Sequence, residues 1–194
     1  ICSSRWDTLK LASCGKATTR MEVRIDSPDP KTHAGEIVCR GANMMLGYYK
    51  NPEATAQIID VNGWLHTGDL GVMDEEGYVT VRGRSKNMLL TSSGQNIYPE
   101  EIESKLNNMP YVSESLIVLQ HDKLVALIYP DFDDAFAHGL QQTDIEKAME
   151  ANRNELNLLL PAYCQITKVK IHFEEFEKTA KKSIKRFMYQ EAKG

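Results

Sequence analysis

The sequence predicts an α+β fold, in which a mostly antiparallel β part precedes a small α+β part with a short sheet flanked by helices. Two observations lead to this class. Short runs that alternate apolar and polar residues, separated by Gly and Pro, occupy the first half of the chain and are typical of half-buried strands. The second half combines further strand pairs with helical patterns. This order favours α+β over a doubly wound parallel sheet.

The first half begins with two predicted strands and a helix. Residues 21–26 and 36–40 have the alternation expected of strands. A short helix is predicted to begin next, because Asn51 can cap it, Pro52 suits its first turn and Glu53 complements the helix dipole.

A predicted hairpin closes the first half. Its strands are residues 70–73 and 78–82, joined by an acidic turn that ends in Gly77. We expect the boundary between the two parts at residues 83–86, where this hairpin ends.

The second half begins with a strand at 88–91 and an amphipathic helix that opens at Pro99. Thr143, with Glu146 three residues later, is the predicted N-cap of a long helix that ends at Pro161. The remaining predicted elements are strands at 116–119, 124–129 and 169–173 and a terminal helix at 184–189.

The composition argues against several classes of partner and site. With 23 Lys and Arg against 27 Asp and Glu, the net charge of −4 argues against a dedicated binder of nucleic acids or anionic membranes, because phosphate contact needs a basic surface. No apolar run approaches the ~20 residues of a membrane-spanning helix. Peripheral contact with a membrane stays open as an alternative. The Cys and His residues show no metal-ligand spacing, so no metal site is predicted, and free thiols in the cytoplasm are favoured. Because the chain does not start with Met, we expect it to be a piece of a longer polypeptide.

Several segments together resemble the adenylate-forming enzymes, which include acyl-CoA synthetases, peptide-synthetase adenylation domains and luciferases. In order, these are Gly-Glu-Ile at 35–37, Gly-Tyr-Tyr at 47–49, Pro-Glu-Ala-Thr at 52–55, a WxxTGD segment at 64–69, a hairpin ending in GRxK at 77–86, an SGxNIxPxEIE segment at 93–103, and Leu-Pro with a following Tyr at 160–163. The version at 93–103 is typical of acyl-CoA ligases. The resemblance implies that residues 1–84 end the large adenylating domain and that 85–194 form the mobile C-terminal domain.

The resemblance also implies a function. The parent protein is expected to be an ATP-dependent, AMP-forming acyl-CoA ligase, with long-chain fatty acids as the preferred substrate. It would use ATP/AMP, CoA and Mg²⁺, the metal being held by groups outside this chain. The family's Ser/Thr/Gly-rich phosphate loop and YGxTE-like segment do not occur in these 194 residues, so the fragment alone is expected to be inactive without an N-terminal region. A peptide-synthetase-type adenylation domain and a non-catalytic interaction module that retains the fold stay open as alternatives.

Asp69, Arg84 and Lys86 are the candidate residues around the WxxTGD and GRxK segments. An ionised Asp can accept hydrogen bonds from both hydroxyls of a ribose, and the planar donor fork of Arg can hold ribose or phosphate oxygens. The resemblance places Lys86 at the hinge about which the small domain rotates. The ordinary alternatives are a turn Asp, a surface Arg and a solvated loop Lys.

Ser93, Gly94 and Gln95 form a candidate CoA-binding loop. In the resembling family this loop borders the pantetheine channel, and Gly94 permits close approach of the backbone. A simple connecting turn is the alternative.

The tail departs from the family pattern. The family's KTxxGKIxR-like segment carries a catalytic Lys, whose fixed charge stabilises the transition state of adenylation. In this chain residues 178–186 place Ser183 at the Lys position and Lys182 at the Gly position. Since a Lys side chain is long and flexible, Lys182 is the candidate substitute. An impaired half-reaction and a solvated basic helix are the alternatives.

Overall fold

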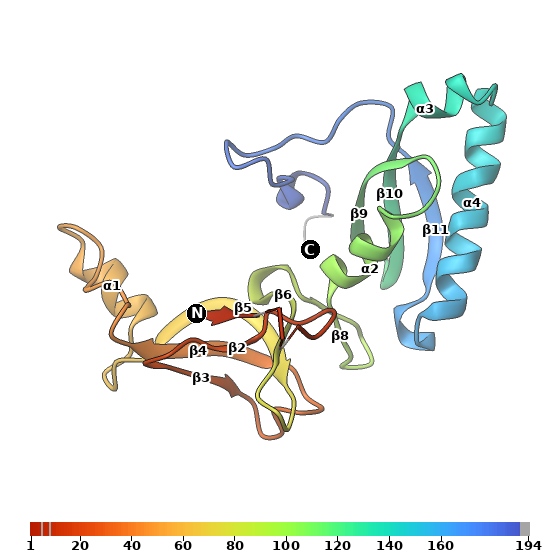
Figure 1. Ribbon diagram of the computed structural model, residues 1–194. Helices are drawn as coiled ribbons and strands as arrows, with labels where there is room; N and C mark the ends of the chain where they lie inside the picture. The colour runs from red at the N-terminus through yellow and green to blue at the C-terminus, as the bar shows by residue number, and fades with distance from the viewer. Residues whose placement is uncertain (5, 8, 191–194) are drawn as a thin grey trace. The chain divides into compact units, whose positions relative to one another are not determined.

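The computed structural model describes residues 1–4, 6–7 and 9–190, and the chain divides into two units, residues 1–87 and 88–194 (Figure 1). The division falls after Asn87, three residues beyond the predicted boundary at Arg84. The α+β class is confirmed, with a four-stranded antiparallel sheet in the first unit and a three-stranded mixed sheet with helices in the second.

The first unit is built on an antiparallel sheet in the order β3-β4-β5-β6. Its strands are β3 (Met21–Asp26), β4 (Gly35–Gly41), β5 (Leu65–Met73) and β6 (Val79–Arg84), preceded by the short pair β1 (Cys2–Ser3) and β2 (Lys16–Ala17), with α1 (Pro52–Ile58) between β4 and β5 and the 3-10 turn η1 (Ser85–Asn87) at the end. Ile25, Ile37 and Val79 form its buried cluster.

Helix α1 begins as predicted. The Asn51 side chain accepts a hydrogen bond from the Ala54 amide at 3.0 Å, and Pro52 occupies the first turn. Because these contacts lie within four residues, the local sequence alone specifies them.

The second unit contains a mixed sheet in the order β11-β10-β9. Its elements are β7 (Leu89–Leu90), β8 (Asn96–Ile97), α2 (Pro99–Leu106), β9 (Val112–Gln120), β10 (Lys123–Pro130), α3 (Phe132–Ala137), α4 (Gln142–Leu159), η2 (Ala162–Cys164), β11 (Ile166–Ile171) and η3 (Arg186–Met188). Strands β9 and β10 pair antiparallel, whereas β11 runs parallel to β10. The parallel step needs a long crossover, which α3 and α4 supply.

The two faces of this sheet are covered differently. Helices α2 and α4 pack on one face through buried residues that include Leu106 and Met149. On the other face, Phe176 from the tail completes a cluster with Leu116 and Val125. Figure 1 shows α4 along one side of β11 and the tail on the opposite side.

Two sequence predictions for the second unit are wrong in detail. The N-cap of α4 is Gln141, whose box partner is Asp144, so Thr143 already lies inside the helix. The terminal helix at 184–189 is absent from the described residues, where only a 3-10 turn, η3, is found. Ile184 instead pairs with Lys178 in an antiparallel bridge and packs against the sheet with Phe176. This long-range packing overrides the local helical pattern.

Candidate functional site

A bulge in β5 carries the WxxTGD segment. Glu36 and Val38 of β4 pair with Leu70 and His66 of β5, so Ile37 alone faces residues 67–69. Gly68 has a φ of 71°, a left-handed conformation that Gly adopts without strain. Residues 67–69 therefore leave the regular ladder with β4, while Asp69 keeps its pairing with β6, and bulges of this kind are common beside functional sites.

Glu36 holds this bulge in place. Its Oε1 accepts a hydrogen bond from the Gly68 amide at 2.8 Å, and its Oε2 lies 2.7 Å from His66 Nδ1. Thr67 Oγ1 donates to the Ile37 carbonyl at 2.6 Å. The polar groups released from the ladder thus find side-chain partners. The role of Glu36 was not predicted, although Gly-Glu-Ile at 35–37 was among the recognised segments.

Asp69 and Arg84 lie side by side at the bulge. They are partners across β5 and β6, and Arg84 Nε is 2.8 Å from Asp69 Oδ1. The Asp69 side chain is 34% exposed and the Arg84 side chain 53%. An ion pair this exposed contributes only about 0–1 kcal/mol to stability, so both groups can exchange it for contacts with a ligand. The two predicted nucleotide contacts therefore form one accessible pair.

Trp64 anchors the start of the segment. Its buried ring stacks with the guanidinium groups of Arg24 and Arg40, 4.3 and 4.7 Å from the ring centroid. The Trp64 amide donates to Asp60 Oδ1 at 2.8 Å, and this hydrogen bond lowers the pKa of the Asp60 carboxyl. Sequence spacing does not predict the contacts of these two arginines, because Arg24 and Arg40 lie on β3 and β4.

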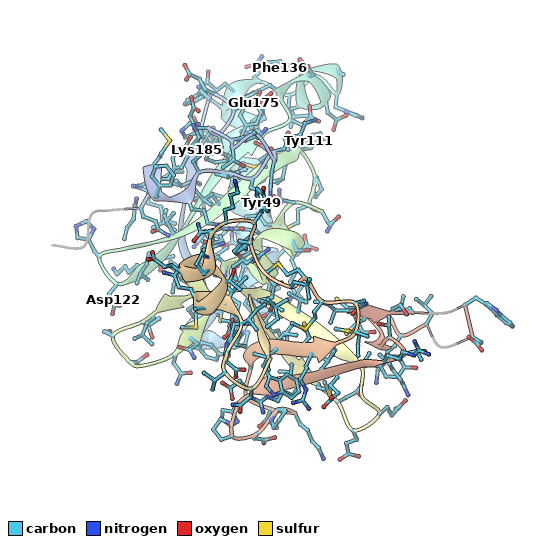
Figure 2. All side chains as sticks on the ribbon, turned by 90° about the vertical axis from the view of Figure 1, so that its left-hand side faces the viewer. Tyr49, Tyr111, Asp122, Phe136, Glu175 and Lys185 are labelled. Atoms are coloured by element: carbon cyan, nitrogen blue, oxygen red, sulfur yellow. The ribbon has the colours of Figure 1, made fainter. Side chains whose placement is uncertain are left out.

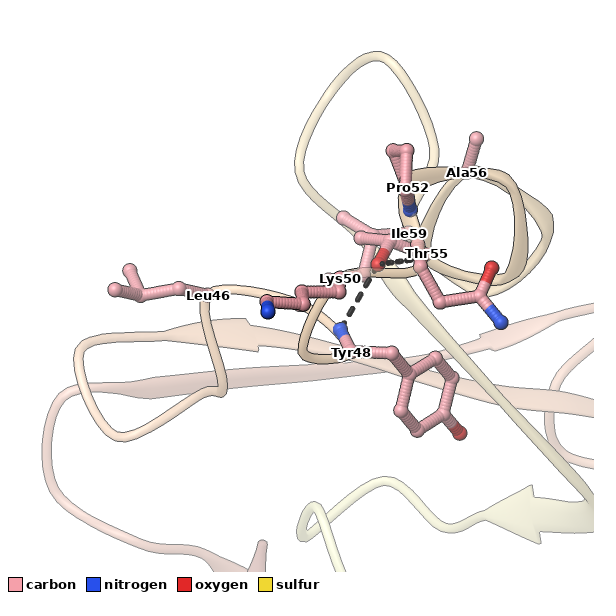
Figure 3. Close-up of a pocket in the computed structure, with 9 residues that line it drawn as sticks. Leu46, Tyr48, Lys50, Pro52, Thr55, Ala56 and Ile59 are labelled. Carbon is pink, nitrogen blue, oxygen red and sulfur yellow. Dashed lines mark hydrogen bonds between the residues drawn. The ribbon is translucent and has the colours of Figure 1, made fainter.

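A shallow pocket lies at α1, formed by the segment that carries Gly-Tyr-Tyr. Tyr48 donates its amide to Thr55 Oγ1 at 2.9 Å, and that hydroxyl donates to the Asn51 carbonyl (Figure 3). The pocket is lined by residues 46–48, 50–52, 55, 56 and 59, and none of the predicted site residues is among them.

Lys86 lies in η1 at the end of the first unit and is exposed. It lies one residue before the last residue of the first unit, Asn87.

Ser93, Gly94 and Gln95 form an exposed turn between β7 and β8. The Thr91 amide donates to the Gln95 carbonyl at 3.1 Å, and Gly94 has a φ of 78° with open space beside it. The turn is tied to Asp122, which accepts from the amide and the hydroxyl of Ser92; these bonds lower the pKa of the Asp122 carboxyl. Asp122 is labelled in Figure 2.

Lys182 lies in a tight turn of the tail. The Thr179 amide donates to the Ser183 carbonyl and the Lys182 amide to the Thr179 carbonyl, both at 2.8 Å. Lys182 has a φ of 59°, a conformation that favours Gly, and its side chain is exposed. A Gly, which the resemblance implies at this position, would adopt this backbone conformation without strain. Ser183, also exposed, follows directly.

Within residues 1–4, 6–7 and 9–190, no three His, Cys, Asp or Glu side chains are grouped to hold a metal ion. Over the same residues, no helix combines the length and apolar character of a membrane span.

Comparison with known proteins identifies the family to which this chain belongs. Residues 86–192 match the model of the AMP-binding enzyme C-terminal domain. An octahydroindenyl-propanoyl:CoA ligase from Rhodococcus jostii is 47% identical over 104 residues, which cover 54% of this chain and 19% of that protein. A 2-methylpropanoate–CoA ligase from Humulus lupulus is 34% identical over 186 residues, covering 89% of this chain and 32% of that protein.

A solved structure agrees with these relatives. The o-succinylbenzoate CoA synthetase of Bacillus subtilis, in complex with its acyl-adenylate intermediate, matches with a TM-score of 0.74 and 26% identity, over 94% of this chain and 36% of that one. The chain thus spans about a fifth to a third of the length of these relatives. The chain belongs to the AMP-binding enzyme family and carries its C-terminal domain at residues 86–192.

Proposed function

We propose that this chain is the C-terminal portion of an AMP-forming acyl-CoA ligase. In the first half-reaction a substrate carboxylate oxygen attacks the α-phosphorus of ATP, the bond to the leaving oxygen breaks, and acyl-AMP and pyrophosphate form. In the second, the CoA thiolate attacks the acyl carbon and AMP leaves. The relatives named as CoA ligases support this reaction class.

The exposed pair of Asp69 and Arg84 on the β5 bulge is the observation that carries the proposal. When a nucleotide binds, the Asp69 carboxylate accepts hydrogen bonds from the ribose hydroxyls, and Arg84 donates to ribose or phosphate oxygens. Glu36 keeps the bulge in the conformation that presents Asp69. The site fits the ribose side of ATP or AMP, and Mg²⁺ would enter with ATP through groups outside this chain.

The other candidate residues act at separate steps of this reaction. Lys182 supplies positive charge to the transition state of adenylation, in place of the Lys that Ser183 replaces. The turn of Ser93, Gly94 and Gln95 borders the pantetheine of CoA in the second step. Lys86 is the hinge between the two conformations, at the division between the units.

The proposal specifies the acyl substrate only as a carboxylic acid and does not specify which acid. The expectation of a long-chain fatty acid has no support from the named relatives, whose acids are a bicyclic propanoate, 2-methylpropanoate and o-succinylbenzoate.

Replacing Asp69 in the full-length protein tests the site. Hydrogen bonds to a charged group contribute about 1.5–3 kcal/mol each, so Asp69→Ala is expected to lower kcat/KM for ATP by about 10- to 100-fold in carboxylate-dependent ATP–pyrophosphate exchange. Glu75→Ala is the matched control, because Glu75 is an exposed carboxylate in the same hairpin, paired with Lys31 at 2.7 Å. Equal exchange by both variants would remove Asp69 from the site.

The isolated chain is expected to show no carboxylate-dependent exchange, because the sequence contains no phosphate loop. The assay needs only the purified chain, ATP, radiolabelled pyrophosphate and a panel of acids. Robust exchange by the chain alone would contradict the proposed division of the ATP site.

A further inference from the structure

Two ion pairs flank the turn that carries Lys182. Before the turn, Lys178 Nζ lies 2.8 Å from Glu114 Oε1 of β9, and both side chains are 26% exposed. After it, Arg186 Nη1 donates to Glu103 Oε1 of α2 at 2.9 Å, and Nη2 makes a second bond to Oε2. The Arg186 and Glu103 side chains are 15% and 9% exposed. The turn is thus attached to the body of the second unit on both sides.

Glu103 is itself fixed to the sheet. Its Oε1 also accepts a hydrogen bond from the Ile117 amide of β9 at 2.7 Å. The carboxylate therefore connects helix α2, strand β9 and the tail. A largely buried side chain held by three hydrogen bonds has little freedom to move.

The tail from Phe176 to Tyr189, which includes both ion pairs, is internally ordered. Lys178 and Ile184 form an antiparallel bridge, and the Lys185 amide donates to the Glu177 carbonyl at 2.8 Å. Phe176 is buried against the sheet, with the Tyr189 ring 5.2 Å from its own. Movement of Arg186 would therefore be transmitted to Lys182 through a short, hydrogen-bonded segment.

We propose that Glu103 and Arg186 are positioning residues for adenylation, which hold the Lys182 turn at a fixed place on the second unit. This inference rests on the proposed function of Lys182. Replacing a buried ion pair by neutral groups is often close to neutral for stability, so stability alone does not account for the pair. A bidentate Arg–carboxylate contact fixes the orientation of both side chains. The catalytic cation, Lys182, needs a fixed position of this kind.

Hydrogen exchange on the 194-residue chain tests the anchoring directly. The double variant Glu103→Gln with Arg186→Met keeps an acceptor for the Ile117 amide and leaves no buried charge unpaired. Its Thr179 and Lys182 amides are expected to exchange about tenfold faster than in the wild type. The control Lys185→Met removes an exposed pair with Glu177 (3.3 Å) from the same tail and should leave these rates unchanged; Lys185 is labelled in Figure 2. Unchanged rates in the double variant would overturn the inference.

The two half-reactions of the full-length protein test the catalytic consequence. Misplacing Lys182 should lower acyl-AMP formation on the order of 10²-fold, while thioester formation from supplied acyl-AMP and CoA stays unchanged. Lys185→Met should affect neither. An equal fall in both steps, or normal acyl-AMP formation despite faster amide exchange, would overturn the positioning role. If the wild type makes no acyl-AMP, the proposed function fails, and amide exchange alone decides the anchoring.

Discussion

Lys182→Ala in the full-length protein is expected to lower acyl-AMP formation by about 10²–10³-fold, the loss typical of removing one fixed transition-state donor. Lys182 is the cation that we propose as the substitute for the catalytic Lys, whose position the resemblance assigns to Ser183. Its exposed side chain belongs to a turn fixed by hydrogen bonds. Because Ala has the same backbone restriction at a φ of 59°, the change removes the charge without a new conformational cost. Single-turnover formation of acyl-AMP is the measurement.

Lys181→Ala is the matched control for this prediction. Lys181 is an exposed Lys in the same turn, so equal and small effects of the two changes would exclude Lys182 as the substitute. A second variant restores the family pattern: Lys182→Gly with Ser183→Lys should recover most of the activity that Lys182→Gly alone removes. No recovery would indicate that this turn does not reach the reacting phosphate.

Arg186→Met is expected to destabilise the second unit by about 3–5 kcal/mol at neutral pH, because it leaves the Glu103 carboxylate buried without its cation. Adding Glu103→Gln should recover most of this loss, since the charge disappears and the Ile117 amide keeps an acceptor. Urea unfolding followed by circular dichroism at helical wavelengths reports mainly the second unit, which holds α2, α3 and α4, whereas the first unit holds the short helix α1. Both Trp residues belong to the first unit, so their fluorescence should be unaffected.

The destabilisation caused by Arg186→Met is expected to depend on pH. Burial raises the pKa of Glu103 despite its pairing with Arg186, so the folded chain holds this proton more tightly than the unfolded chain does. The contribution of the Glu103 carboxyl to the free energy of unfolding is fully present below its pKa in the unfolded chain, about 4.3. It is lost as the pH rises through the pKa of Glu103 in the folded chain. Removing Arg186 raises the pKa of Glu103 further, so the destabilisation should shrink as pH falls toward 4. A loss that is the same at pH 4 and pH 7 would contradict this account.

Local interactions explain which parts of the fold the sequence predicted. The cap of α1 was correct because Asn51, Pro52 and Ala54 are neighbours in the chain. The local pattern of the tail predicts a helix, but Ile184 packs on a sheet formed by distant residues. The parallel pairing of β10 and β11 was not predicted either, because it depends on the crossover through α4.

The candidate site shows the same limit. Motif order identified Asp69 and Arg84, and the structure pairs them across β5 and β6. The support from Glu36, which is 32 positions from Gly68, could not be read from spacing. Glu103 and Arg186 are 83 positions apart, and only the folded second unit brings them together.

The products formed from ATP by the full-length protein test the central claim most directly. With a panel of carboxylic acids and CoA, we expect one AMP and one pyrophosphate for each acyl-CoA formed, for at least one acid in the panel. Acyl-AMP should accumulate when CoA is omitted. Release of ADP and phosphate, or no nucleotide turnover with any acid, would contradict the assignment as an AMP-forming acyl-CoA ligase.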